Sequence, residues 1–283
     1  MDYSREFMRK LQKKGYLYSL QDFNYGKKKI VIPNYNEPIL KDLNIFQSKT
    51  KSTSYRGSPF FSMVTLLYIE QKFPNTCVII PDKTNGHLKH EDLSIRYNEI
   101  LGRVVIPERF WEMFYNCSRK RYVVFPFGYS CKNSGGHANI MIYDRLNKSL
   151  ERFEPYGSLD DMITEKNKKC FEVDIDEVLF DLFDKRGLIV EYFPPSNFIP
   201  QEGLQKKQEN ENSMHRTDPE GFCTMWSLFY CDLRLSNPDV EREKLLDYTI
   251  ESFRRNKKSL TTFIRDYANI VSELAPCLTK NQN

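Results

Sequence analysis

Cys223, His137 and Glu154 are residue types that could supply a nucleophile, a base and an orienting carboxylate. Cys223 lies two residues after Gly221 and opens the apolar run CTMWSLFYCDLRL, so we expect it in the first turn of a helix. The unpaired N–H groups and the dipole at that end of a helix favour a thiolate over a thiol. An isolated cysteine is more often a packing residue, so the chemistry depends on a histidine beside it.

A predicted hairpin brings His137 and Glu154 together. Residues 137–144 and 149–154 have the β-branched and apolar composition of strands, and the intervening DRLN has the Asp and Asn typical of a tight turn. A four-residue loop makes the numbers of paired residues add up to 291. This register places His137 directly opposite Glu154, with the two Cβ atoms about 5 Å apart. A carboxylate at that position fixes the histidine tautomer and stabilises its cation.

The alternative for this pair is a histidine that begins a strand and a carboxylate at the rim, with no shared chemistry. Two features of the sequence favour a site instead. The glycines of SGG before His137 leave room for a substrate backbone, because glycine admits close approach. The segment EPYG ends the second strand at Glu154 with a Pro and a Gly, and active-site residues collect where regular elements end.

The elements that position these residues are predicted from hydrophobic patterning, and strands followed by helices indicate an α+β fold. Strands are predicted at 76–81, 121–127, 137–144, 149–154 and 187–193. Helices are predicted at 58–73, 106–117, 222–235, about 239–255 and 259–274. We expect a central mixed or antiparallel sheet flanked by helices, with the Cys223 helix packed against the sheet and Trp226 in the core beneath the site.

The chain is expected to have two parts. Residues 1–55, rich in Lys, Tyr and Asn, are read as an N-terminal appendage, and residues 56–283 as the domain that carries the site. Within that domain, residues 194–221 are polar and contain Pro and Gly. A loop of that length in a compact domain is usually functional or mobile.

Composition limits the class of protein. With 40% hydrophobic and 14% aromatic residues, the chain is folded rather than disordered. It lacks a long apolar run, and its N-terminus lacks the apolar core of a signal peptide, so we expect no membrane span and a cytoplasmic, reducing location. The net charge is +4. Basic runs at 9–14, 26–29 and 118–121 are read as solvated surface, with contact to nucleic acid or an acidic partner as the alternative.

The cysteines predict neither a disulfide framework nor a metal site. The seven are odd in number and without repeated spacing or CxxC pairs, and the four histidines are scattered. Cys131, in the loop before His137, is read as a bystander that could approach the site. The cysteines expected to be packing residues are Cys77, Cys117, Cys170, Cys231 and Cys277.

Two segments resemble the adenain and SUMO-protease superfamily of cysteine peptidases. GGHANIMIYDRLNKSLERFEPYG is similar to its His–acid hairpin, and DPEGFCTMWSLFYCDLRL is similar to its cysteine helix, so the resemblance covers roughly residues 120–235. The order His137, Glu154, Cys223 fits this superfamily and differs from the Cys–His–Asn order of papain-like proteases. The elements SLFY and RL resemble those of superfamily proteases from large DNA viruses. The abundance of Lys, Asn, Tyr and Phe is also typical of an AT-rich genome, such as that of a large DNA virus or its host.

The sequence also departs from the pattern of the superfamily. The family usually has Trp directly after the His, where this sequence has Ala138, and Asp-Cys-Gly at the nucleophile, where this sequence has FCT. Its oxyanion Gln lies about six residues before the Cys, where this sequence has Thr217. Gln205 or Gln208, in the preceding polar segment, would take that role if the segment carries an insertion.

The resemblance implies a thiol peptidase that cleaves a protein or a ubiquitin-like conjugate without a metal or an organic cofactor. Cys223 would attack the carbonyl, His137 would act as base and then acid, and Glu154 would orient the imidazole. A glutamate as third member is similar to bacterial effector acetyltransferases of the same superfamily, so a transferase with an acetyl-Cys intermediate is one alternative. The other is a catalytically silent protein-binding module, which the departures around the cysteine favour.

Overall fold

The structure of the chain is a computed structural model that describes residues 59–79, 94–98, 101–131, 135–158, 174–211, 222–257 and 259–279. The predicted N-terminal appendage, residues 1–55, lies outside these described residues. The boundary between the appendage and the domain therefore stays a prediction.

Strands dominate the middle of the chain, and helices dominate its last third. The strands are β1 (Thr76–Val78), β2 (Ile95–Asn98), β3 (Arg103–Val105), β4 (Tyr122–Cys131), β5 (Gly135–Asp144), β6 (Ser149–Phe153) and β7 (Glu191–Phe193). The α-helices are α2 (Pro59–Lys72), α4 (Phe110–Asn116), α5 (Ile175–Asp184), α6 (Leu204–Glu209), α7 (Cys223–Ser236), α8 (Arg242–Arg255) and α9 (Leu260–Thr279). Single 3₁₀ turns are η2 (Cys117–Arg119) and η4 (Pro195–Asn197).

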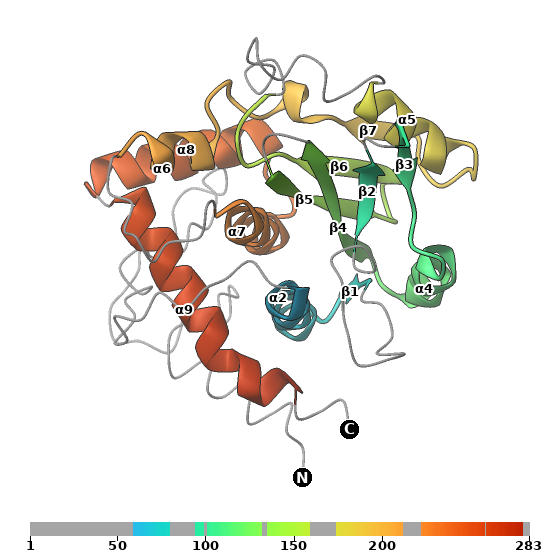
Figure 1. The fold of residues 1–283 in the computed structure, drawn as a ribbon, viewed down its shortest axis with the longest axis horizontal. Coiled ribbons are helices and arrows are strands. Elements are labelled where there is room, and N and C mark those ends of the chain that lie inside the picture. The colour runs from blue at the N-terminus through green and yellow to red at the C-terminus, as the bar shows by residue number, and fades with distance from the viewer. Residues whose placement is uncertain are drawn as a thin grey trace.

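A seven-stranded mixed sheet has the order β3-β2-β4-β5-β6-β7, and β1 also pairs with β4 (Figure 1). Strands β4, β5 and β6 form an antiparallel meander, whereas β1 and β2 run parallel to β4 and β7 runs parallel to β6. The short β1 and β2 lie end to end along one edge of β4, which they contact at 122–124 and 127–130. The predicted α+β class, with a mixed sheet flanked by helices, is confirmed.

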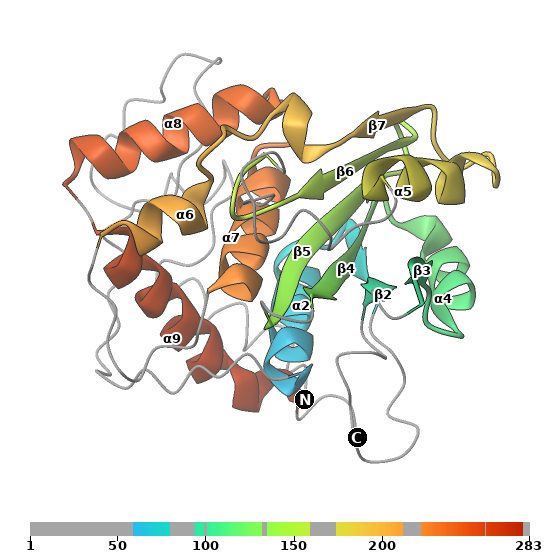
Figure 2. The same cartoon turned by 45° about the horizontal axis from the view of Figure 1, so that its top comes forward.

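Helices cover both faces of the sheet. Helices α7 and α2 lie against one face with α9 beyond them, and α4 and α5 lie on the other (Figure 1, Figure 2). Side chains alternate along β5 accordingly. Ile140 and Ile142 join the core that contains α7, whereas Met141 and Tyr143 join the core that contains α4 and α5. The meander is therefore buried on both sides.

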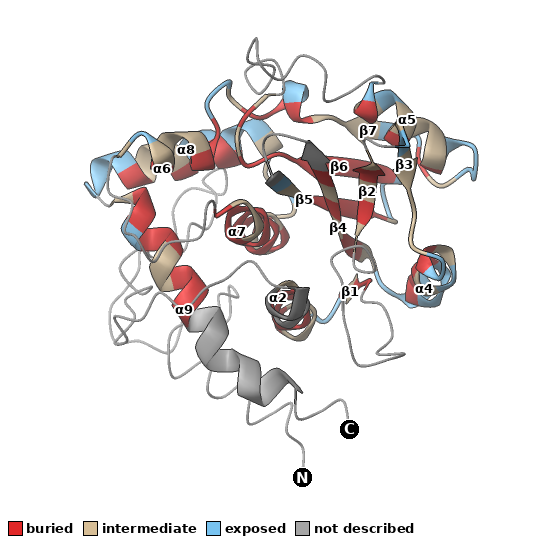
Figure 3. Ribbon diagram, viewed as in Figure 1, coloured by how far each residue is buried: buried red, intermediate tan, exposed pale blue. Residues whose placement is uncertain are grey.

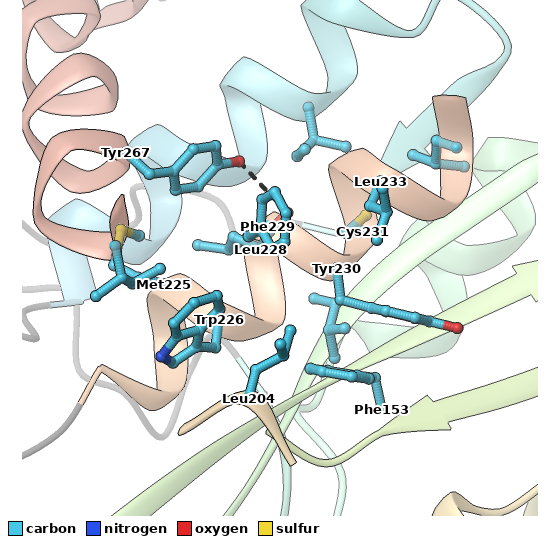
Figure 4. Packing of buried hydrophobic residues seen from close by; sticks show 14 of the residues in the cluster. Phe153, Leu204, Met225, Trp226, Leu228, Phe229, Tyr230, Cys231, Leu233 and Tyr267 are labelled. Carbon is cyan, nitrogen blue, oxygen red and sulfur yellow. Dashed lines mark hydrogen bonds between the residues drawn. The ribbon is translucent and has the colours of Figure 1, made fainter. Parts of the chain in front are cut away.

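Helix α7 is the central helix of the molecule and is buried along nearly its whole length (Figure 3). Trp226 has no exposed surface and stacks on Phe263 of α9, which confirms the predicted place of this tryptophan in the core. On the sheet side, Tyr230 stacks on Phe153 of β6 with ring centroids 4.0 Å apart (Figure 4). Such a helix is apolar on nearly all sides because the sheet and the other helices enclose it.

Residues 194–221 do not form one long loop, so that prediction is wrong for the part the structure describes. The segment contains η4 and α6, and Leu204 of α6 is buried in the core beside α7 (Figure 4). Its last ten residues, 212–221, lie outside the described part. Helix α5 and the short strands β2 and β3 at one end of the sheet are further elements that patterning did not predict. Strands of three or four residues carry little periodicity.

The hairpin of β5 and β6 contains the predicted strands in a different register. Asp144 pairs with Ser149 across the turn 145–148, so the numbers of paired residues add up to 293 rather than 291. The carboxylate of Asp144 accepts hydrogen bonds from backbone N–H groups of this turn. These bonds favour a turn that starts one residue later than predicted. A slip of two residues keeps every side chain on its predicted face. His137 and Glu154 are consequently diagonal neighbours instead of direct partners.

Two cysteines that were expected to be packing residues form a disulfide. Cys77 of β1 is bonded to Cys117 of η2, with Cα atoms 5.7 Å apart. The prediction for this pair is wrong because the end of α4 returns beside β1, a proximity that sequence spacing does not reveal. Cys231 is buried as predicted, whereas Cys170 and the side chains of Cys131 and Cys277 lie outside the described part of the chain.

The turn after Glu154 crosses the start of α6 at two glycines. Gly157 has a φ of +135°, and a Cβ added there would lie 1.9 Å from the carbonyl oxygen of Gln201. A Cβ added at Gly203 would lie 2.5 Å from the carbonyl oxygen of Pro155. The N–H of Gly203 donates to the carbonyl of Tyr156 at 2.8 Å. Only glycine at both positions permits this approach.

We expect Gly157→Ala to lower the free energy of unfolding by about 3 kcal/mol or more, because it combines an unfavourable φ with backbone overlap. Gly136→Ala is the matched control, since a Cβ there meets no atom within 4 Å, and it should change stability by less than about 0.5 kcal/mol. Equilibrium denaturation by urea measures both. Equal stability of the two variants would contradict the glycine crossing.

Candidate active site

His137 and Glu154 form a buried hydrogen-bonded pair beside the start of β5. The Nε2 atom of His137 lies 2.5 Å from Oε1 of Glu154. The side chain of Glu154 has no exposed surface, and that of His137 is 11% exposed. Because β6 ends at Phe153, Glu154 is the first residue beyond the strand.

The carboxylate of Glu154 accepts four hydrogen bonds. Its Oε1 accepts from the ring of His137 and from the backbone N–H of Tyr156 at 3.0 Å. Its Oε2 accepts from the hydroxyl of Tyr129 at 3.1 Å and from Nδ2 of Asn139 at 2.8 Å. Burial opposes ionisation, but the charge of His137 and the donors outweigh it and lower the pKa of Glu154. The group is an ionised carboxylate with satisfied lone pairs.

Sequence reasoning missed the donors Tyr129, Asn139 and Tyr156. Tyr129 lies directly opposite His137 in the register of β4 and β5, and Asn139 follows two residues later on the same face. The pairing of β4 with β5 would have identified them, since side chains of the same face alternate along both strands. Tyr156 belongs to the turn held by the glycine crossing, and its ring lies edge-on to His137 with centroids 5.6 Å apart.

Cys223 is the first residue of α7, as predicted, and its thiol contacts His137. The side chain is half-buried and hydrogen-bonded to the imidazole, and it also accepts from the backbone N–H of Ala138. The hydroxyl of Ser227, one turn later, donates to the carbonyl of Ala138 at 3.1 Å. The first turn of α7 is therefore fixed against β5 by two bonds to one residue of the strand.

The three side chains polarise one another. Burial would raise the pKa of Cys223, but the imidazole of His137 and the N–H of Ala138 outweigh burial and lower it. Burial would lower the pKa of His137, but Glu154 and Cys223 outweigh burial and raise it to about 10. These opposite shifts describe a thiolate beside an imidazolium. Since Nε2 faces Glu154, Nδ1 is the ring nitrogen left for Cys223.

The two glutamines predicted as oxyanion donors lie on α6, and both are buried. The backbone N–H of Gln205 donates to the carbonyl of Pro155 at 2.9 Å. Its side-chain Nε2 donates to Glu209 at 3.1 Å, and Glu209 also accepts from the hydroxyl of Tyr156. The structure thus brings His137, Glu154 and Cys223 together, and it attaches α6 to this site through Tyr156.

Among the residues that the structure describes, no group of three or more His, Cys, Asp and Glu side chains could hold a metal ion. None of the described helices combines the length and the apolar character that crossing a membrane requires.

Comparison with known sequences gives one distant relative. No family model matches the sequence. The chain is 25% identical over 254 residues to the protein named "Putative ankyrin repeat protein L371" of Acanthamoeba polyphaga mimivirus. The alignment covers 78% of this chain and 32% of that protein, so the chain spans about a third of the length of its relative.

The solved structures include distant likenesses to this chain, among them the following three. The effector protein ChlaDUB1 of Chlamydia trachomatis aligns with a TM-score of 0.41 and 12% identity, over 80% of this chain and 85% of that chain. The effector Cdu1 of the same bacterium, bound to ubiquitin, gives 0.40 and 12%, over 78% and 95%. The SUMO protease Ulp1, with its catalytic cysteine oxidised to a sulfinic acid, gives 0.33 and 13%, over 95% of each chain. TM-scores this low do not establish a common fold.

We expect alkylation of Cys223 to remain fast at mildly acidic pH. A lowered pKa means that the thiolate is present above the folded-state value and is lost as the pH falls through that value, which lies below the roughly 8.5 of a free cysteine. In His137→Ala the midpoint should rise toward about 8.5, and the rate at about pH 6 should fall at least tenfold. Mass spectrometry of the Cys223 peptide after timed exposure to iodoacetamide measures both midpoints.

Cys231 is an internal control in the same experiment, because its thiol is buried deeper in α7 and should not react in the folded protein. Glu154→Ala should move the Cys223 midpoint in the same direction as His137→Ala. If neither substitution moves it, the three residues do not form one site.

Proposed function

We propose that this chain is a thiol peptidase of the adenain and SUMO-protease superfamily, acting on a protein or a ubiquitin-like conjugate inside the cell. The observation that carries the proposal is a single imidazole, that of His137, hydrogen-bonded to both the thiol of Cys223 and the buried carboxylate of Glu154. A packing cysteine needs no such partner, and a silent binding module gains nothing from a polarised thiol. The proposed substrate class follows from the resemblance of the hairpin and of the cysteine helix.

The reaction follows from the order of the three groups. The Cys223 thiolate attacks the scissile carbonyl and forms a C–S bond, while the carbonyl π electrons move to oxygen. As the tetrahedral intermediate collapses, the C–N bond breaks and His137 gives its proton to the leaving amine. His137 then takes a proton from a water molecule that attacks the thioester. The C–S bond breaks, which releases the carboxylic acid and restores the Cys223 thiolate beside the protonated His137. Glu154 keeps the imidazole oriented and stabilises its cation throughout.

Gln205 is the side chain that we propose as oxyanion donor. It is buried on α6, beside the turn that carries Tyr156 and close to the Glu154 end of the site. Its neighbour Gln208 lies on the same helix, and the Gln208 backbone carbonyl accepts from Thr261 of α9. The backbone N–H of Cys223 is a second donor for the oxyanion, because the first N–H groups of a helix have no acceptor within the helix.

Electrophilic probes made from ubiquitin and from SUMO should label this protein at Cys223, and Cys223→Ala should abolish the labelling, because the probe requires a positioned thiolate. Cys231→Ala is the matched control and should be labelled like the wild type. Gel shift and peptide mapping give the readout.

Labelling that persists in Cys223→Ala would assign the reaction to another cysteine. A stable acetyl adduct on Cys223 after incubation with acetyl-coenzyme A, without probe labelling, would replace peptidase by acetyl transfer.

Gln205→Ala should lower kcat for a fluorogenic amide of the labelled modifier by about 10²–10³-fold, because one oxyanion donor is lost. The same variant should leave the alkylation of Cys223 unchanged, since iodoacetamide alkylation forms no oxyanion. Gln208→Ala, on the same helix, should retain activity within a few-fold. The reverse result would assign the role to Gln208, and full activity in both would leave the backbone N–H of Cys223 as the donor.

A further inference from the structure

Behind Glu154, a line of buried polar side chains runs from the site to α5. Asn139 donates from Nδ2 to Glu154 at 2.8 Å and accepts at Oδ1 from the guanidinium of Arg152 at 2.6 Å. Arg152 donates two further bonds of 2.7 Å to the two carboxylate oxygens of Asp176, in the first turn of α5. Tyr192 of β7 donates to the same Asp176 at 2.5 Å. Asn139 and Arg152 have essentially no exposed surface.

The chemistry of the neighbours forces the orientation of the Asn139 amide. A guanidinium only donates hydrogen bonds, and an ionised carboxylate only accepts them. Asn139 lies between the guanidinium of Arg152 and the carboxylate of Glu154. Its oxygen must therefore face Arg152, and its nitrogen must face Glu154. An ionised aspartate has no donor for Glu154, and an aliphatic side chain has neither group. The Asn139 amide thus links the buried guanidinium of Arg152 to the buried carboxylate of Glu154, and His137 remains the charged partner of Glu154.

Arg152 is itself held away from Glu154. Its paired donation to Asp176 occupies two of its N–H directions, in the geometry that suits a carboxylate best. The side chain of Asp176 is 18% exposed, so the line begins near the surface and ends at the fully buried Glu154. A fully buried charge of this kind is costly and adds little net stability. The specific hydrogen bonds along this line therefore point to a role in orientation.

We propose that Asn139, oriented by Arg152 and Asp176, is a positioning residue that holds the Glu154 carboxylate toward His137. This inference rests on the proposed function, because Glu154 matters only if His137 and Cys223 react. The side chain of Asn139 is hydrogen-bonded to Glu154 and Arg152, so it acts on the reaction through Glu154. Its effect is on the fraction of Cys223 present as thiolate in mildly acidic solution, where the support of Glu154 for the imidazolium is needed most.

The test compares Asn139→Leu with Asn139→Asp by the alkylation rate of Cys223 relative to the wild type, at about pH 5.5 and about pH 7.5. Asn139→Leu lacks the donor at every pH, so its rate should be about tenfold low at the acidic pH. Its deficit should shrink at the higher pH, because there the thiol ionises increasingly without support. The variant therefore approaches the wild type as the pH rises.

Asn139→Asp should show the opposite trend. Two carboxyl groups this close share a proton in mild acid, and the shared O–H supplies the donor that the amide supplied. The rate at about pH 5.5 should therefore stay within about threefold of the wild type. When both groups ionise at the higher pH they repel each other, Glu154 is displaced, and the deficit grows.

Asn237 provides matched controls, because it is a buried asparagine near the far end of α7 whose Nδ2 donates to the carbonyl of Leu233 at 2.9 Å. Asn237→Leu and Asn237→Asp show how far the same two substitutions affect Cys223 when they are made away from the site. Their alkylation rates should equal that of the wild type at both pH values. Thermal denaturation verifies that each variant is folded. Asp176→Asn, at the partly exposed end of the line, keeps Asn139 in place and should lower the rate about threefold at the acidic pH.

Opposite pH trends for the two Asn139 variants support the inference. Parallel trends, or wild-type rates in Asn139→Leu and Asp176→Asn, overturn it. If His137→Ala still moves the Cys223 midpoint in that case, the proposed function stands without the positioning role. A wild-type Cys223 that titrates like a free cysteine would overturn the proposed function and this inference together.

Discussion

An ionised carboxylate with no exposed surface is the constraint on which this end of the sheet depends. Removing such a charge from water costs several kcal/mol unless other groups replace the lost solvation. For Glu154 the replacement comes from an imidazole, a phenol, an amide and a backbone N–H, which belong to β4, β5 and the turn after β6. The N–H of Tyr156 is local to Glu154, whereas the other three donors come from strands that only the folded sheet brings beside it. The sheet register, the glycine crossing and the polarised thiol are consequently parts of one arrangement.

The position of the thiol depends on a different kind of constraint, the burial of α7. Two further charge clusters fix this helix along its length. Asp232 accepts from Lys72 of α2 at 2.7 Å, and Glu151 of β6 accepts from Tyr230 at 3.1 Å and from Arg234. Buried pairs of this kind add little stability but allow few alternative arrangements. A nucleophile at the first residue of such a helix is placed by the whole core rather than by a loop.

The sequence contained enough information for the class of fold, the strands of the hairpin and the three side chains of the site, but not for their exact pairing. The predicted hairpin register was wrong by two residues and still placed His137 and Glu154 on one face, because strand faces repeat every two residues. The pairing of Arg152 with Asp176 and the Cys77–Cys117 bond were not predictable in this way. Their partners lie on other elements, and periodicity within one segment says nothing about which segments meet.

The crossing of Gly157 and Gly203 has a consequence for how this protein can change over generations. The contact is made by backbone atoms, so no side chain can be adjusted to accommodate a substitution at either glycine. Neither position can drift alone, and a relative that has replaced one of them must have rerouted the chain at both. Such a relative would also have moved Tyr156 away from its imidazole. The two glycines are therefore expected to be inherited as a pair, and their joint presence in a diverged sequence would mark the same turn even where the surrounding residues have changed beyond comparison.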